Sequence, residues 1–97
     1  MIVGACRVVL FLPESHSLKE KRHVIKSILA RVHNQFNVSA AEVEEQDLWQ
    51  RAVLGVAVVT NDTHHANEVL SSVVNFIQNA NPAAEMTDYE IDIAPIL

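Results

Sequence analysis

Cysteine, glycine, proline and aromatic residues are all scarce in this 97-residue sequence, with one Cys, two Gly, three Pro and 5% aromatics. A single cysteine, Cys6, excludes an internal disulfide and a multi-cysteine metal site, which is typical of a protein in the reducing cytoplasm. The shortage of glycine and proline indicates long regular elements with few breaks. There is no glycine-rich phosphate loop, nucleophile elbow or paired-carboxylate site, so we expect a protein that is not an enzyme.

Positive charge is absent from the second half of the chain. All seven Lys and Arg residues lie within residues 1–51, which gives that half a formal charge of +1 and residues 52–97 a charge of −6. Five of the seven cations fall between Lys19 and Arg31. Cations concentrated on one element of an acidic chain indicate a surface for an anionic partner. The acidic total excludes a strong general nucleic-acid binder, whose domain is usually basic.

Apolar periodicity and capping residues predict six elements in one domain, residues 1–97, in the order strand, helix, strand, strand, helix, strand. The apolar start is interrupted by Arg7 and is too short to span a bilayer, so no membrane contact is expected. The expected elements are Ile2–Leu12, 17–35, Asn37–Val43, Leu48–Thr60, a helix that begins at 61–63 and ends at 79–82, and Met86–Ile93.

This order predicts an α+β, ferredoxin-like βαββαβ sandwich, with two helices on one face of a four-stranded antiparallel sheet. Right-handed crossovers place the first and third strands at the centre and the fourth beside the first. Alternation along the first strand puts Cys6 in the core, as an inert buried thiol, and Val9 and Phe11 on the open face. Arg7 shares that face, where we expect it to pair with the acidic row of the last strand. This row comprises Asp88, Glu90 and Asp92.

Helical spacing separates the cations of the first predicted helix. Lys19, Arg22 and Lys26 fall on one flank, with His33 at its far end, and Arg31 lies on the opposite face. Lys21 falls in the apolar sector, where we expect its stem to pack and its ammonium to reach water.

Lys19, Arg22 and Lys26 are therefore the candidate phosphate-binding residues, because a row of point charges can neutralise successive backbone phosphates. The loop at residues 14–17 adds hydroxyls and helix N-terminal amides that suit phosphate oxygens. Lysines in a first helical turn also oppose the helix dipole, a small cost that favours a role other than stability. A solvated helix face explains the same residues without a ligand, and this alternative stays open.

The five histidines do not form a metal-ligand pattern. His64 and His65 are adjacent and point about 100° apart on a helix, so they do not readily chelate one ion. His16 and His23 lack a cysteine or carboxylate cluster at ligand spacing. We expect neither a metal nor another cofactor.

Trp49 is the only tryptophan, and it opens the third predicted strand beside an acidic loop. It either closes one end of the core or serves as an exposed anchor, since Trp is favoured at interface hot spots. Together with Phe11 and Val9 it forms the candidate partner-binding set. These residues support the alternative function, a homo-oligomeric or protein-adaptor module that uses the open sheet face, as a homodimer for example, with no nucleic-acid role.

Two stretches, SLKEKR (17–22) and QDLWQRAVLGV (46–56), resemble the YlxP-like family of small bacterial proteins. The likeness covers nearly the whole chain, including Phe36–Ser39 and Ala41–Val43. The resemblance implies a ferredoxin-like fold, an unknown function and no catalytic residues. The family's genes often lie near those of initiation factor two and ribosome-binding factor A, which implies a role in translation.

The leading expectation is therefore a non-enzymatic translation or ribosome-maturation factor. It would contact the phosphate of ribosomal RNA, or of a ribosomal subunit, through Lys19, Arg22 and Lys26.

Overall fold

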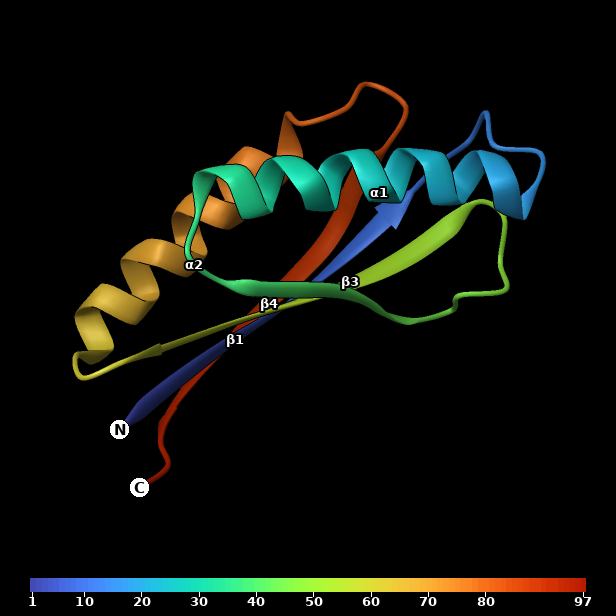
Figure 1. Cartoon of the computed structure of the whole chain (residues 1–97). Coiled ribbons are helices and arrows are strands. Elements are labelled where there is room, and N and C mark those ends of the chain that lie inside the picture. Colours follow the sequence, from blue (N-terminus) through green and yellow to red (C-terminus); the bar gives the residue numbers. More distant parts are fainter.

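The structure, a computed structural model, describes all 97 residues (Figure 1). Its elements follow the predicted order strand, helix, strand, strand, helix, strand, with bounds that differ from the predicted ones by up to three residues. They are β1 (Ile2–Phe11), α1 (Leu18–Gln35), β2 (Ser39–Glu44), β3 (Arg51–Thr60), α2 (Thr63–Gln78) and β4 (Glu85–Pro95).

The largest difference concerns the start of β3, which lies at Arg51 and not at Leu48. Glu45, directly after β2, has the left-handed backbone angle φ = 58°, which turns the chain away from the strand ladder. Residues 45–50 therefore form a loop, which we call the β2–β3 loop. Trp49 belongs to this loop and does not open a strand.

The four strands form one antiparallel sheet in the order β2-β3-β1-β4, so β1 and β3 are central and β4 lies beside β1. Both helices lie on the same face of this sheet, and no element covers the other face (Figure 1). The predicted ferredoxin-like sandwich is confirmed. We call the uncovered side the open face.

The core fills the space between the helices and the sheet. Each helix contributes one apolar stripe, with Ile25, Ile28 and Val32 on α1 and Leu70 and Val73 among those on α2. Close approach of α2 depends on a glycine in β1, because a Cβ added at Gly4 would lie 2.9 Å from a methyl carbon of Leu70. A Gly4→Ala change would therefore require the Leu70 side chain to shift.

Cys6 is buried in this core, as alternation predicts. Burial raises the pKa of its thiol from the ordinary 9.0 to about 11, because the thiolate charge is poorly solvated there. The shift alone lowers the thiolate population about 100-fold at neutral pH, and only the thiolate reacts with disulfide reagents.

We expect Cys6 in the folded protein to react with a chromogenic disulfide reagent at pH 8 at least about 100-fold more slowly than a free thiol. The reaction should become rapid in denaturant, which exposes the thiol. Absorbance of the released chromophore measures both rates. Equal rates with and without denaturant would show that the thiol is accessible in the folded state.

Candidate binding surfaces

The seven Lys and Arg side chains divide into two groups. Four are held by groups of the protein itself. They are Arg7 with Glu44, Lys21 with Glu42, Arg51 with Glu45, and Arg31, which donates to the carbonyl of Ala80 and lies over the Phe76 ring. The other three, Lys19, Arg22 and Lys26, are exposed and have no ion-pair partner. We call these three the α1 basic row, and they are the residues predicted to bind phosphate.

Lys21 lies one residue before Arg22 but is fully buried. Its ammonium nitrogen lies 2.8 Å from Oε2 of Glu42 and donates hydrogen bonds to the backbone carbonyls of Glu45 (2.8 Å) and Arg51 (3.1 Å). Two carbonyls thus accept hydrogen bonds from the ammonium, and the Glu42 carboxylate balances its charge. The prediction that this ammonium reaches water is wrong, because β2, the β2–β3 loop and the start of β3 each place an oxygen against it.

Glu45 and Arg51 stand at the two ends of residues 46–50, so Lys21 joins both ends of this segment to α1. The loop is also anchored to the chain between β1 and α1. Gln50 donates from its side-chain amide to the carbonyls of Pro13 and Ser15, and its own carbonyl accepts from the amide of Leu12. The position of Trp49, within this segment, therefore depends on contacts with α1 and the β1–α1 loop.

Arg7 has a different partner from the one expected. It sits opposite Glu90 in the β1–β4 register, but its guanidinium donates two hydrogen bonds, of 2.9 and 2.7 Å, to both carboxylate oxygens of Glu44 on β2. This bidentate contact favours Glu44 over Glu90 as the partner, because it aligns two N–H donors of the guanidinium with the two oxygens of one carboxylate. It raises the pKa of Arg7 and lowers the pKa of Glu44. The predicted pairing with the last strand is wrong, and Asp88, Glu90 and Asp92 are left without an ion pair.

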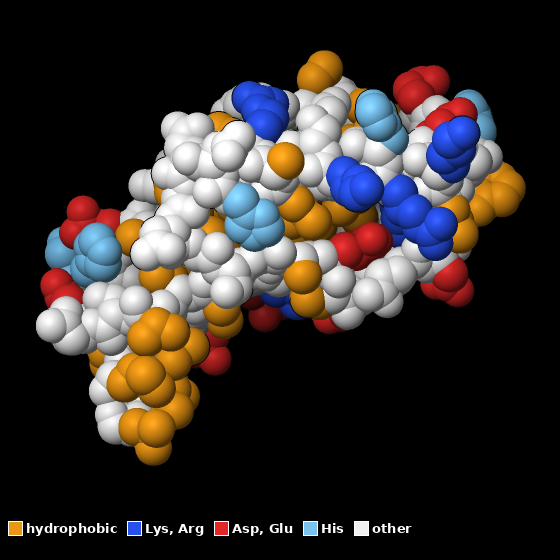
Figure 2. Space-filling model, in the orientation of Figure 1, with side chains coloured by type: hydrophobic (Ala, Val, Ile, Leu, Met, Phe, Trp, Pro, Cys, Tyr) orange, Lys and Arg blue, Asp and Glu red, His pale blue; other side chains and the backbone are white.

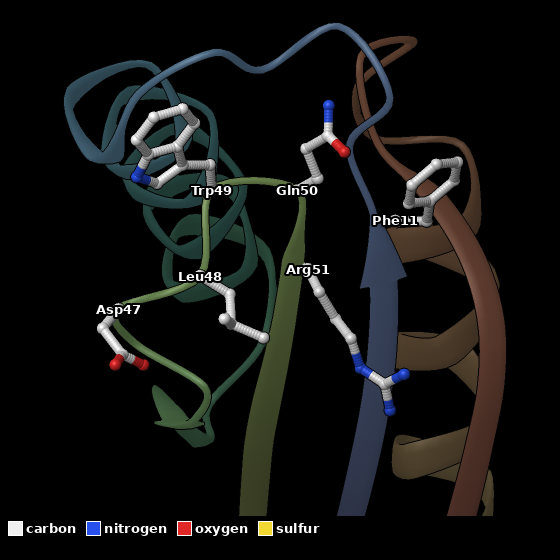
Figure 3. Close-up of a pocket in the computed structure, with 6 residues that line it drawn as sticks. All are labelled: Phe11, Asp47, Leu48, Trp49, Gln50 and Arg51. Carbon is white, nitrogen blue, oxygen red and sulfur yellow. The ribbon is translucent and has the colours of Figure 1, made fainter.

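Trp49 and Phe11 lie at one end of the open face, where both line a pocket of about 580 Å³ (Figure 3). The two rings stand on either side of Gln50, and Leu48 and Arg51 lie below them in this view. Trp49 is 55% exposed, so it does not close the core, and the exposed-anchor alternative fits its position. The remaining lining residue is Asp47.

Val9, the third residue of the predicted partner-binding set, does not contribute to this surface. It faces the open side but is only 5% exposed, and its neighbour in the register, Val53, is completely buried. Neither side chain belongs to the core under the helices. The protein's own side chains therefore cover this part of the open face, which strand alternation does not reveal.

The loop before α1 does not offer the free phosphate ligands that its sequence suggests. The Ser17 hydroxyl accepts from the amide of Glu20, and the Glu20 carboxylate accepts from the amide of His16. The Ser15 hydroxyl is buried and donates to the carbonyl of Ser17. A carboxylate therefore already occupies the helix N-terminus, and the α1 basic row alone remains as the candidate phosphate-binding group.

No group of three or more His, Cys, Asp and Glu side chains is arranged to hold a metal ion. His64 lies 3.1 Å from a carboxylate oxygen of Glu68, one helical turn further along α2. Neither helix is long and apolar enough to cross a membrane.

Residues 3–91 match the family described as "Protein of unknown function (DUF503)". The chain belongs to this family. It is also 42% identical to "Uncharacterized protein YlxP" of Bacillus subtilis (strain 168) over 78 residues, which cover 80% of this chain and 85% of that relative. The resemblance seen in the sequence is confirmed, and neither description names an activity or a ligand.

Two solved structures share the fold. One is acylphosphatase from Bacillus subtilis, with a TM-score of 0.56 and 12% identity over 100% of this chain and 89% of that chain. The other is the de novo designed protein Foldit4, with a TM-score of 0.55 and 13% identity over 100% of both chains. At such identities the likeness shows the ferredoxin-type fold alone. Since one of the two is an enzyme and the other a designed protein, the shared fold carries no activity with it.

We expect the Lys21→Met variant, which keeps a long apolar side chain, to lose about 3–5 kcal/mol of unfolding free energy. The change leaves the Glu42 carboxylate and two loop carbonyls without their donor. Chemical denaturation followed by Trp49 fluorescence measures the loss. Lys19→Met, its exposed counterpart, is the matched control and should stay within about 0.5 kcal/mol of wild type.

The double variant Lys21→Met/Glu42→Leu tests whether the loss comes from an orphaned charge. Replacing both partners of a buried pair by apolar groups is often nearly neutral, so the double variant should be more stable than Lys21→Met. Wild-type stability of Lys21→Met would contradict the buried ion pair.

Proposed function

We propose that this protein is a non-enzymatic binding protein that contacts RNA phosphate through the α1 basic row, as an accessory factor in translation or ribosome maturation. One observation carries the proposal: the only three Lys and Arg side chains without a partner in the protein lie together on one flank of one helix. In Figure 2, most of the visible Lys and Arg side chains lie over the N-terminal half of α1.

The spacing of the row suits a polyanion. Lys19 and Lys26 are seven residues apart, which is about 10 Å along a helix axis, so the row extends beyond a single phosphate group. Arg22 and Lys26 border a shallow depression of about 230 Å³, whose floor is formed by Ile25 and Leu29. A nucleic-acid backbone would lie along this depression with its phosphates toward the cations.

The one acid that lines this depression does not cancel the field of Arg22 and Lys26. Glu42 lines the same depression as Arg22 and Lys26, but its carboxylate is paired with the ammonium of Lys21. The buried lysine thus leaves the exposed cations available for a ligand. Lys19, in the first turn of α1, also costs a few tenths of a kcal/mol through the helix dipole, so stability does not explain its presence.

The mechanism is charge neutralisation and positioning without base readout. We propose ribosomal RNA as the ligand because the family's genes often lie near genes for translation factors. With about three phosphate contacts, the logarithm of the binding constant should fall with the logarithm of salt concentration with a slope of about −2 to −3. Binding is expected to be weak and confined to low and moderate salt.

We expect the protein to co-sediment with ribosomal subunits at low salt and the Lys19/Arg22/Lys26→Ala variant to stay in the supernatant. The charge-matched control is Asn67/Ser72/Asn75→Asp, which changes the net charge equally at exposed positions of α2. It should sediment like wild type. Equal sedimentation of wild type and the α1 variant, or equal loss in both variants, would rule out a specific role for the row.

A further inference from the structure

The open face has an apolar floor at the end nearest the chain termini. Val3 pairs with Val59 and Ala5 with Ala57 in the β1–β3 register, and Val59 is 66% exposed. The floor continues toward β2 as a hollow of about 340 Å³, in which Val43 lies over Gly55. The small side chains of Ala5 and Ala57 leave room here for an element of another chain to approach the backbone closely.

An acidic margin runs along one side of this floor. Asp92, Glu90 and Asp88 of β4 stand opposite Ala5, Arg7 and Val9, respectively, so all three share the open face with the floor. We call them the β4 acidic row. All three are exposed, and none has an ion-pair partner. The one cation within reach, Arg7, is paired with Glu44 of β2, the strand at the opposite edge of the sheet.

We propose that the open face binds a basic amphipathic segment of a partner protein. Its apolar side would pack on Val3, Ala5, Ala57 and Val59, and its Lys or Arg residues would pair with the β4 acidic row. A helix is the natural form of such a segment, because α1 and α2 cover the opposite face of the same sheet in this way. Charge complementarity favours a basic amphipathic segment, because the floor is apolar and the unpaired charges along its margin are all negative.

The carboxylates of the β4 acidic row exclude RNA and a second copy of this protein as the ligand of the open face. RNA phosphate would meet three unpaired carboxylates. A second copy, docked face to face, would bring another acidic row and no free cation, because Arg7 and Arg51 are both paired with carboxylates of their own chain. The proposal is also independent of phosphate binding, which uses the helix side of the molecule.

The test uses a synthetic helical peptide with leucines on one side and lysines on the other, labelled for fluorescence anisotropy, and the full-length protein. We expect wild type to bind it and Asp88→Asn/Glu90→Gln/Asp92→Asn to bind about tenfold more weakly. The matched control Glu14→Gln/Glu68→Gln/Asn75→Lys changes the net charge equally at exposed positions away from the open face and should bind as wild type does. Val59→Ser should weaken binding without changing the charge.

Four outcomes would overturn the proposal. The first two are equal loss of affinity in the row variant and its control, and equal binding of a peptide that has glutamates in place of its lysines. The third is competition for the peptide by an RNA oligonucleotide. The fourth is a concentration-dependent dimer in sedimentation velocity that Val59→Ser abolishes. The Lys19/Arg22/Lys26→Ala variant should keep full affinity for the peptide. Failure of phosphate binding and failure of peptide binding are thereby distinguishable.

Discussion

The burial of the Lys21 ammonium is the interaction on which two surfaces of this protein depend, the pocket lined by Trp49 and the α1 basic row. Taking an ammonium and a carboxylate out of water costs several kcal/mol for each ion, and here one carboxylate and two carbonyls offset that cost. The carbonyls belong to the two ends of the segment that carries Trp49, so the buried charge fixes the position of the exposed aromatic ring. The carboxylate belongs to Glu42, whose neutralisation leaves the field of Arg22 and Lys26 intact. One buried ion pair thus shapes the pocket at the sheet end and the cationic flank of α1.

The sequence predicts the features that are local in the chain. Alternation and helical periodicity depend on neighbouring residues, which is why the order of elements, the sheet topology and the flank of Lys19, Arg22 and Lys26 are found without the structure. The partners of Lys21 and Arg7 lie 21 to 37 residues away in the sequence, and no spacing rule connects them. The place of Trp49 depends on a left-handed residue, Glu45, that is not a glycine and so gives no signal. Val9 shows the limit of strand alternation, which predicts the face of the sheet on which a side chain lies but not whether neighbouring side chains bury it.

The two proposals assign opposite charges to opposite sides of one small sandwich. Cations of α1 lie on the helix side, and the unpaired acids of β4 lie on the open face. A protein of this kind would contact RNA phosphate with one side and a basic protein segment with the other. RNA–protein assemblies contain both kinds of ligand. The acidic net charge is compatible with both contacts, because each surface carries charge of its own sign.

The central claim is that one lysine of the three is structural and two are free. Amine-reactive labelling of the folded protein, followed by mass spectrometry of the peptides, tests this directly, because Lys19, Lys21 and Lys26 are the only lysines in the chain. The account predicts rapid modification of Lys19 and Lys26, with Lys21 protected until the protein unfolds. Labelling of Lys21 at the rate of its two neighbours in the folded protein would contradict it.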